Sequence, residues 1–117
     1  MRVRLLDIAH ARSGDKGDMA NVGVIALRAE WYAPLAQCLT APLVAEHFAP
    51  LINGPVERFE LANLWALNFL LHGALDGGGT RSLKLDAQGK VLSTAMLRLV
   101  LDVPDAVAAA AGLPAAR

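Results

Sequence analysis

The chain has 117 residues and a formal net charge of zero, because 11 lysines and arginines balance 11 aspartates and glutamates. A neutral chain of this length fits one domain and lacks the basic stripe of a nucleic-acid-binding surface, so we expect no nucleic-acid partner. Hydrophobic residues make up 55% of the chain, more than in an average soluble domain, and this surplus favours a homo-oligomer with a buried interface.

Cysteine content and the N-terminal sequence indicate the compartment. Cys38 is the single cysteine of the chain, which favours a reducing environment over a disulfide framework. The apolar run near the N-terminus is too short for a signal peptide, and Asp7 interrupts it. No stretch reaches the roughly 18 apolar residues of a membrane span, so we expect a cytoplasmic protein without a membrane partner.

Two short apolar segments flank a polar stretch at the start of the chain. Residues 2–9 lean toward β-structure, and Asn21–Leu27 is rich in β-branched side chains. We predict that the two segments form an antiparallel pair of strands, joined by a polar loop over residues 10–18. Gly23, inside the second strand, marks either a bulge or a close approach of the backbone.

After this pair the apolar spacing becomes helical. Residues 31–39 predict one helix, and Thr40 caps a second helix that has Pro42 in its first turn. The second helix carries an apolar stripe formed by Val44, Phe48, Leu51 and Ile52. The Asn-Gly-Pro sequence at residues 53–55 ends the helical region.

A hairpin is predicted next. Val56–Leu61 alternates, with Glu57, Phe59 and Leu61 on one side, which is typical of a strand near the edge of a sheet. The apolar run within Leu64–Gly73 fits either a buried strand or a short helix. We favour the strand, because it pairs with the preceding one as a hairpin.

The rest of the chain predicts a helix, a short strand and a tail. The helix begins near Lys90 and ends near Met96, and residues 97–103 alternate as a strand does, although a continued helix also fits. An Ala-rich tail at residues 105–117 follows the domain at 1–104 and is either a short helical cap or disordered. The order of elements predicts an α+β fold, with an antiparallel sheet of about four strands and two main helices on one face.

The polar loop is the first candidate ligand site. Gly14 and Gly17 can turn successive N–H groups toward an anion, while Arg12 and Lys16 could hold a carboxylate or a phosphate. The acidic residues of the loop could orient these cations, or could hold a hard metal ion together with an asparagine. The candidate ligand-binding residues are Arg12, Ser13, Gly14, Asp15, Lys16, Gly17, Asp18 and Asn21. The alternative is a solvated turn without a ligand.

A glycine-rich segment at residues 76–82 is the second candidate. Three consecutive glycines lose much conformational entropy on folding, so they favour a place where the backbone closely approaches a ligand or another chain segment. The candidate ligand-binding residues are Asp76, Gly77, Gly78, Gly79 and Ser82. We expect this loop and the polar loop to meet and to form one site.

His10 is the candidate general base, because it borders the polar loop and imidazole titrates near neutral pH. A purely structural role is the alternative. His72 is predicted on the strand that leads into the glycine loop, and it would form a two-histidine site with His10 if the loops meet. His47 is expected on a helix surface and Cys38 in the core. The spacing of these residues fits no zinc site, and the sequence names no cofactor.

The stretch Asp7–Asp18, followed by Asn21, resembles the signature of the small C-terminal domain of the acyclic terpene utilisation (AtuA) family. The resemblance covers about residues 4–103 and includes the motifs Ala66–Phe69, Leu75–Gly79 with Ser82-Leu83, and Asp86–Lys90. It implies a ferredoxin-like sandwich, in agreement with the α+β prediction. It also adds Asn68 to the candidate ligand-binding positions.

The resemblance implies a setting in the bacterial catabolism of branched, terpenoid acyl compounds, where family genes accompany those of acyl-CoA carboxylation and oxidation. It implies no settled reaction and carries over no established catalytic residue. Typical members have a long N-terminal region before this module, which this sequence lacks. We therefore expect either a larger AtuA-type partner protein or a module that works alone.

Two functions fit these observations. The first is an accessory or binding subunit, a small dimer that docks on a larger partner and binds an acyl or carboxylate ligand. The second is an enzyme that acts on an acyl thioester or a carboxylic acid, with His10 as base and an oxyanion site made by the Arg, Lys and glycine-loop N–H groups. A third option is Mg²⁺-assisted chemistry at Asp15, Asp18 and Asp76. One concave pocket shared by His10 and both loops would favour the enzyme.

Overall fold

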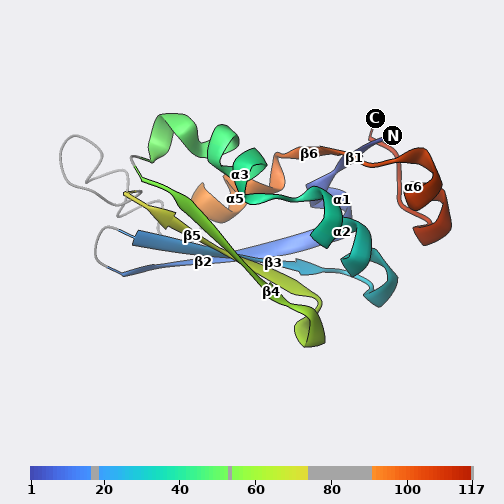
Figure 1. The fold of residues 1–117 in the computed structure, drawn as a ribbon, viewed down its shortest axis with the longest axis horizontal. Coiled ribbons are helices and arrows are strands. Elements are labelled where there is room, and N and C mark those ends of the chain that lie inside the picture. Colours follow the sequence, from blue (N-terminus) through green and yellow to red (C-terminus); the bar gives the residue numbers. More distant parts are fainter. Residues whose placement is uncertain (17–18, 53, 74–90, 117) are drawn as a thin grey trace.

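The computed structural model describes residues 1–16, 19–52, 54–73 and 91–116. Its centre is a four-stranded antiparallel sheet with the strand order β2-β3-β5-β4 (Figure 1). The strands are β2 (Ala9–Lys16), β3 (Met19–Ala26), β4 (Val56–Leu61) and β5 (Ala66–His72). A second, two-stranded ladder pairs β1 (Arg2–Arg4) with β6 (Val100–Asp102).

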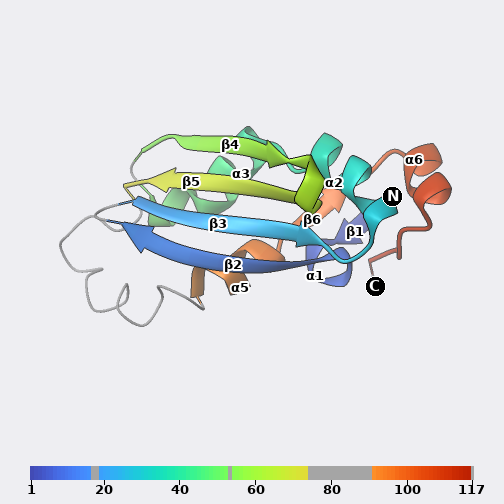
Figure 2. The same ribbon diagram turned by 90° about the horizontal axis from the view of Figure 1, so that it is seen from below.

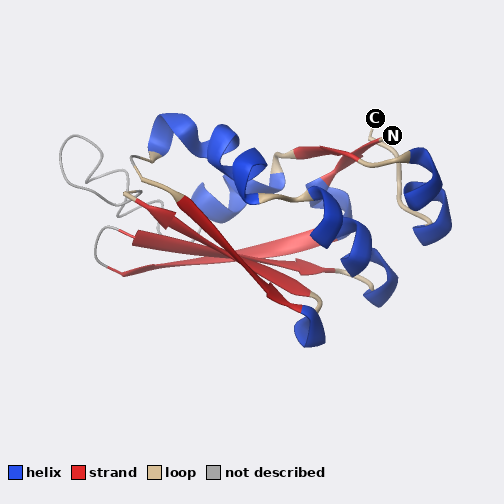
Figure 3. Cartoon of the chain, viewed as in Figure 1, coloured by secondary structure: helices blue, strands red, loops and turns tan. Residues whose placement is uncertain are grey.

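The helices lie on one side of the sheet, and Figure 2 shows the sheet from its other side with the helices behind it. They are α1 (Leu5–Ile8), α2 (Tyr32–Cys38), α3 (Ala41–Phe48), α5 (Val91–Leu97) and α6 (Asp105–Ala111). Three short 3₁₀ turns are η1 (Ala29–Trp31), η2 (Ala49–Leu51) and η3 (Ala62–Leu64), and Figure 3 separates helices from strands by colour. The predicted fold class, an α+β layer with helices on one face, is confirmed.

The strand order contains a split β-α-β unit. Strands β3 and β4 are both antiparallel to β5, which lies between them, so β3 and β4 run in the same direction and are connected through α2 and α3. Helix α5 follows β5, as the second helix of a ferredoxin-like domain does. The fourth place in the sheet, beside β3, is taken by β2, which precedes the unit in the sequence.

The hydrophobic core fills the space between the sheet and the helices. Every second residue of β3 is buried, as are Leu67, Phe69 and Leu71 of β5, and the helices cover this face with side chains that are also buried. The largest fully buried side chains include Phe48, Phe69, Leu35, Leu67, Leu71 and Met96. The alternation leaves the other residues of each strand on the opposite face.

The prediction of one strand over residues 2–9 is wrong. Strand β1 ends at Arg4, and one turn of helix follows, because Leu5 and Ile8 are both buried at helical spacing. The Arg4 guanidinium also binds the Asp7 carboxylate, with an Nε–Oδ2 distance of 2.8 Å. This turn lets β1 pair with β6, so the partner of β3 is a later segment.

The predicted polar loop over residues 10–18 is for the most part a strand. Strand β2 pairs with β3 residue by residue, from Ala9 opposite Ala26 to Lys16 opposite Met19. Its polar side chains did not indicate a strand, but the continuous ladder satisfies the backbone N–H and C=O groups. Residues 17–18 lie outside the described part of the chain.

Most of the other predicted elements are confirmed. The Thr40 hydroxyl accepts a hydrogen bond from the Leu43 N–H at 3.3 Å and so caps α3. Strand β4 is an edge strand and forms a hairpin with β5, which settles the ambiguous segment as a strand. The alternation after α5 corresponds to β6, and the Ala-rich tail contains α6, whose Ala108 is buried.

Candidate functional site: the outer face of the sheet

The outer face is the side of the four-stranded sheet that faces away from the helices (Figure 2). Cross-strand pairing aligns its residues in rows. The central row contains Arg12, Gly23, Asn68 and Phe59. The row on one side contains Gly14, Asn21, Leu70 and Glu57, and the row on the other side contains His10, Ile25, Ala66 and Leu61.

The outer face brings together five of the predicted site residues, namely His10, Arg12, Gly14, Asn21 and Asn68. The Asn21 side chain donates from Nδ2 to Asn68 Oδ1 at 3.5 Å, a long hydrogen bond between two strands. The side chains of Arg12 and His10 are exposed and have no hydrogen bond or ion pair with another described side chain or backbone group. An exposed guanidinium on the same face as two amides can bind a carboxylate from outside the chain.

Gly23 leaves a gap in the middle of the central row. Its backbone is extended, and a Cβ atom built there would meet no atom closer than Asn68 Oδ1 at 3.9 Å. Neither the local conformation nor crowding inside the chain therefore requires glycine. Glycine weakens a strand, and it suits a place where something from outside approaches the backbone. The gap between Arg12 and Asn68 is thus open to an approach from outside the sheet.

One end of the outer face is apolar and continues into the β4–β5 turn. We call Phe59, Leu61, Leu64 and Trp65 the apolar tip, and all four side chains are exposed. Trp65 is 44% exposed and has a left-handed backbone with φ of 54°, which is uncommon for a residue other than glycine. An exposed aromatic side chain held in such a turn is typical of an interaction surface.

The other end of the outer face is polar. The His72 imidazole lies 2.5 Å from Glu57, measured between Nε2 and Oε2. His72 pairs with Met19 and His10 pairs with Ile25, so the two histidines are six residues apart along β3, or roughly 20 Å. The predicted two-histidine site is therefore wrong.

Several predicted site residues are not part of this group. Ser13 pairs with the buried Val22 and so belongs to the face that the helices cover. The side chains of Asp15 and Lys16, both in β2, lie outside the described structure, as do Gly17, Asp18, Asp76, Gly77, Gly78, Gly79 and Ser82. The predicted meeting of the two loops falls on these residues.

Side chains elsewhere have structural roles. Burial raises the pKa of the Cys38 thiol, which packs against the core as expected. The prediction of a surface His47 is wrong, since this half-buried ring lies 2.6 Å from the Ala95 carbonyl oxygen and packs edge-on against Phe48. Arg58 donates to the carbonyl oxygens of Ala36 and Leu39 at the end of α2.

The two described pockets lie away from the outer face. One pocket among the described residues lies between α1 and α5, and another is lined by Leu43, Glu46, His47 and Leu99. Neither pocket includes His10 or Arg12. In the part of the chain that the structure describes, no three His, Cys, Asp or Glu side chains gather as metal ligands do. No helix of that part is long and apolar enough to cross a membrane.

The sequence missed the contribution of β4 and its turn to this face. The alternation predicts that Glu57, Phe59 and Leu61 lie on one side of a strand. Only the register shows that this side is the face of Arg12, with Phe59 in the same row. No sequence signal marked Trp65, because its exposure and its backbone conformation depend on the turn.

Comparison with known proteins gives one match. The family model described as the AtuA ferredoxin-like domain matches residues 3–102 of the chain. No curated protein and no solved structure gives a match.

Proposed function

Because the chain belongs to the AtuA ferredoxin-like domain family, we propose that it is a homodimeric binding or accessory subunit in the catabolism of branched, terpenoid acyl-CoA compounds. The outer face is the dimer interface in this proposal. The observation that carries it is the row Arg12–Gly23–Asn68–Phe59, which combines a cation without a described partner, a gap and an exposed aromatic ring on the sheet face that the described helices leave uncovered. A surface of this composition, which lines neither described pocket, suits a protein better than a small molecule.

The two edges of the outer face carry one charged side chain each, of opposite sign. Arg12 lies on β2 at one edge, and Glu57 lies on β4 at the other edge. A two-fold axis parallel to the strands places β2 of one copy over β4 of the second copy. Arg12 then faces Phe59 of the second copy, with Glu57 one row further along, so both a cation–π contact and an ion pair are within reach.

The area of the face supports an interface of modest strength. The four strands have 8, 8, 6 and 7 residues, and with a strand spacing of about 4.8 Å and a rise of about 3.3 Å per residue they form a face of roughly 460 Å². Two copies would therefore bury about 900 Å² over the strands, just under the size of a specific interface. The apolar tip adds contact area and supplies the aromatic side chains that dominate binding energy at interfaces. We expect a dimer that dissociates on dilution.

The geometry favours binding over catalysis by this chain alone. His10 has no carboxylate or second histidine near it among the described residues, and it lies in no described pocket. A general base works best when it is oriented and shielded from water. The dimer leaves the helical side free, and we place there the contact with a larger AtuA-type partner.

Sedimentation equilibrium of the purified chain over a range of concentrations tests the proposal. We expect the mass to rise from 12.3 kDa toward twice that value, and to stay at the monomer mass for Arg12→Glu and for Glu57→Arg. The matched control is Arg98→Glu, the same charge change at an exposed arginine on the helical side. Loss of the dimer in the control, or a monomeric wild type, would contradict the proposal.

A further inference from the structure

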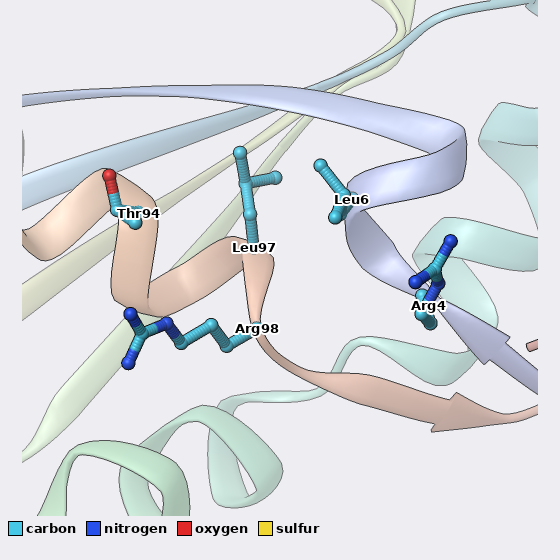
Figure 4. Close-up of a pocket in the computed structure, with 5 residues that line it drawn as sticks. All are labelled: Arg4, Leu6, Thr94, Leu97 and Arg98. Carbon is cyan, nitrogen blue, oxygen red and sulfur yellow. The ribbon is translucent and has the colours of Figure 1, made fainter. Parts of the chain in front are cut away.

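We propose that the pocket between α1 and α5 is a separate binding site for the anionic form of a small aliphatic carboxylic acid. The pocket has a volume of about 380 Å³ and is lined by Arg4, Leu6, Thr94, Leu97 and Arg98 (Figure 4). Its lining combines apolar walls with two guanidinium groups. This combination matches a ligand with an apolar chain and one anionic head.

The apolar wall comes from two leucines on different helices. Figure 4 shows Leu6 on α1 beside Leu97 at the end of α5. Leu6 is 54% exposed, whereas its neighbours Leu5 and Ile8 are fully buried and fix the helical turn against the core. The turn therefore holds Leu6 at the surface, where an aliphatic chain would remove it from water.

The positive charge of the pocket comes from Arg98. The Arg4 guanidinium donates to both carboxylate oxygens of Asp7, at 2.8 and 3.0 Å, so this pair is close to neutral. The Arg98 side chain is exposed and has no hydrogen bond or ion pair with any other described residue. One uncompensated guanidinium thus remains, and it can form two parallel hydrogen bonds with a carboxylate.

Thr94 lines the same pocket and precedes Arg98 by four residues. In Figure 4 the Arg98 side chain runs back along α5, and the Thr94 hydroxyl points away from it on the other side of the helix, so we assign the anionic head to Arg98 alone. When the carboxylate binds Arg98, the aliphatic chain of the acid can cover Leu6 and Leu97.

The size and the place of the pocket limit the ligand further. A volume of about 380 Å³ is near the lower end for ligand pockets, which suits a short or medium aliphatic chain. The pocket belongs to the helical side and shares no lining residue with the outer face. The inference therefore stands whether or not the chain forms the proposed dimer.

Titration of the ¹⁵N-labelled chain with octanoate, followed by NMR, tests the inference. We expect shifts of the backbone amides of Leu6, Thr94 and Leu97, and an affinity about tenfold weaker in Arg98→Gln, which removes the charge but keeps a similar side chain. The matched control is Arg28→Gln, at an exposed arginine that lines neither described pocket, and it should leave the affinity unchanged. Octylamine, with the same chain and a positive head, should not bind.

Each of the other outcomes would overturn the inference. Absence of octanoate binding, or equal affinity in Arg98→Gln and the wild type, would show that Arg98 holds no carboxylate. Equal binding of octylamine would show that the leucines alone attract the chain. Shifts at residues 10–25 that are lost in Arg12→Gln would place the anion on the outer face. Higher salt should weaken octanoate binding, because the guanidinium is exposed.

Discussion

Gly23 pairs with Asn68 at the centre of the outer face, and a Cβ atom at position 23 would come no closer to Asn68 Oδ1 than 3.9 Å. The fold therefore has room for an alanine there. In the proposed dimer, the same gap faces a second copy, and an added methyl group would keep the two sheets apart.

The substitution Gly23→Ala should separate stability from assembly. We expect the monomer, studied at high dilution, to gain about 0.5–1 kcal/mol in the free energy of unfolding, because alanine loses less backbone entropy in an extended strand. The dimer should be weakened. Urea unfolding of the dilute protein measures the first effect, and sedimentation measures the second. If Gly23→Ala lowers the free energy of unfolding of the monomer and leaves dimerisation unchanged, the glycine is needed for the fold and not for assembly.

Arg58 should be the most important arginine for stability. Its guanidinium donates to the Leu39 carbonyl oxygen at 3.0 Å and to that of Ala36, and it binds Glu60 at 3.0 Å, with only 19% of its side chain exposed. The substitution Arg58→Met should reduce the free energy of unfolding by about 2–3 kcal/mol, since it leaves carbonyl groups at the end of α2 without donors.

Urea unfolding of Arg58→Met and of Arg28→Met gives the comparison. Arg28 forms an exposed ion pair with Glu30 at 2.8 Å, so its loss should change stability by less than about 1 kcal/mol. Equal effects of the two substitutions would show that the hydrogen bonds of Arg58 do not tie β4 to α2.

The Cys38 thiol should react slowly with alkylating reagents. Burial raises its pKa above the ordinary value of a thiol, and only the thiolate is nucleophilic. The rate of reaction with iodoacetamide should therefore rise with pH and reach half its maximum at a higher pH than in the unfolded chain. Rapid alkylation of the folded protein near neutral pH would contradict this and would indicate an activated cysteine.

Complementation distinguishes an accessory subunit from an enzyme based on His10. In a strain that needs this gene to grow on a branched acyclic acid, His10→Ala should restore growth, whereas Arg12→Glu should not. The measurement is the growth rate, with protein levels checked on blots. Failure of His10→Ala, with the dimer intact by sedimentation, would instead favour His10 as a general base.

The predictable parts of the fold were those with strong local signals. The alternation of Val56–Leu61 and the Thr40 cap correspond to β4 and to the start of α3 as predicted. The segment around Leu5 was mistaken for a strand, because a short apolar run does not reveal its period. Its helical turn depends on the Arg4–Asp7 pair and on the long-range pairing of β1 with β6.

The candidate site was predicted in part. The loop composition pointed to Arg12 and Asn21, and the family resemblance added Asn68, but Arg12 was predicted in a loop and could not be aligned with β5. Only the register of β2, β3 and β5 shows that these side chains share one face. A slip of one residue in any of these pairings would move them to opposite faces, which is why sequence alone could not assemble the site.

Mixing two charge variants tests the proposed dimer most directly. In one chain, Arg12 and Glu57 lie three strands apart, or roughly 14 Å, so they cannot compensate each other internally. In a dimer of the Arg12→Glu variant, the new carboxylate faces Glu57 of the second copy. In a dimer of the Glu57→Arg variant, the new guanidinium faces Arg12 of the second copy. Each single variant therefore brings two like charges together. An equimolar mixture of the two variants restores opposite charges at both contacts.

We expect each variant alone to sediment as a 12.3 kDa monomer and the mixture to form a heterodimer of twice that mass. The double variant Arg12→Glu/Glu57→Arg should likewise dimerise with itself. If the mixture remains monomeric at concentrations where the wild type is dimeric, Arg12 and Glu57 do not meet across two copies, and the outer face is not the interface that we propose.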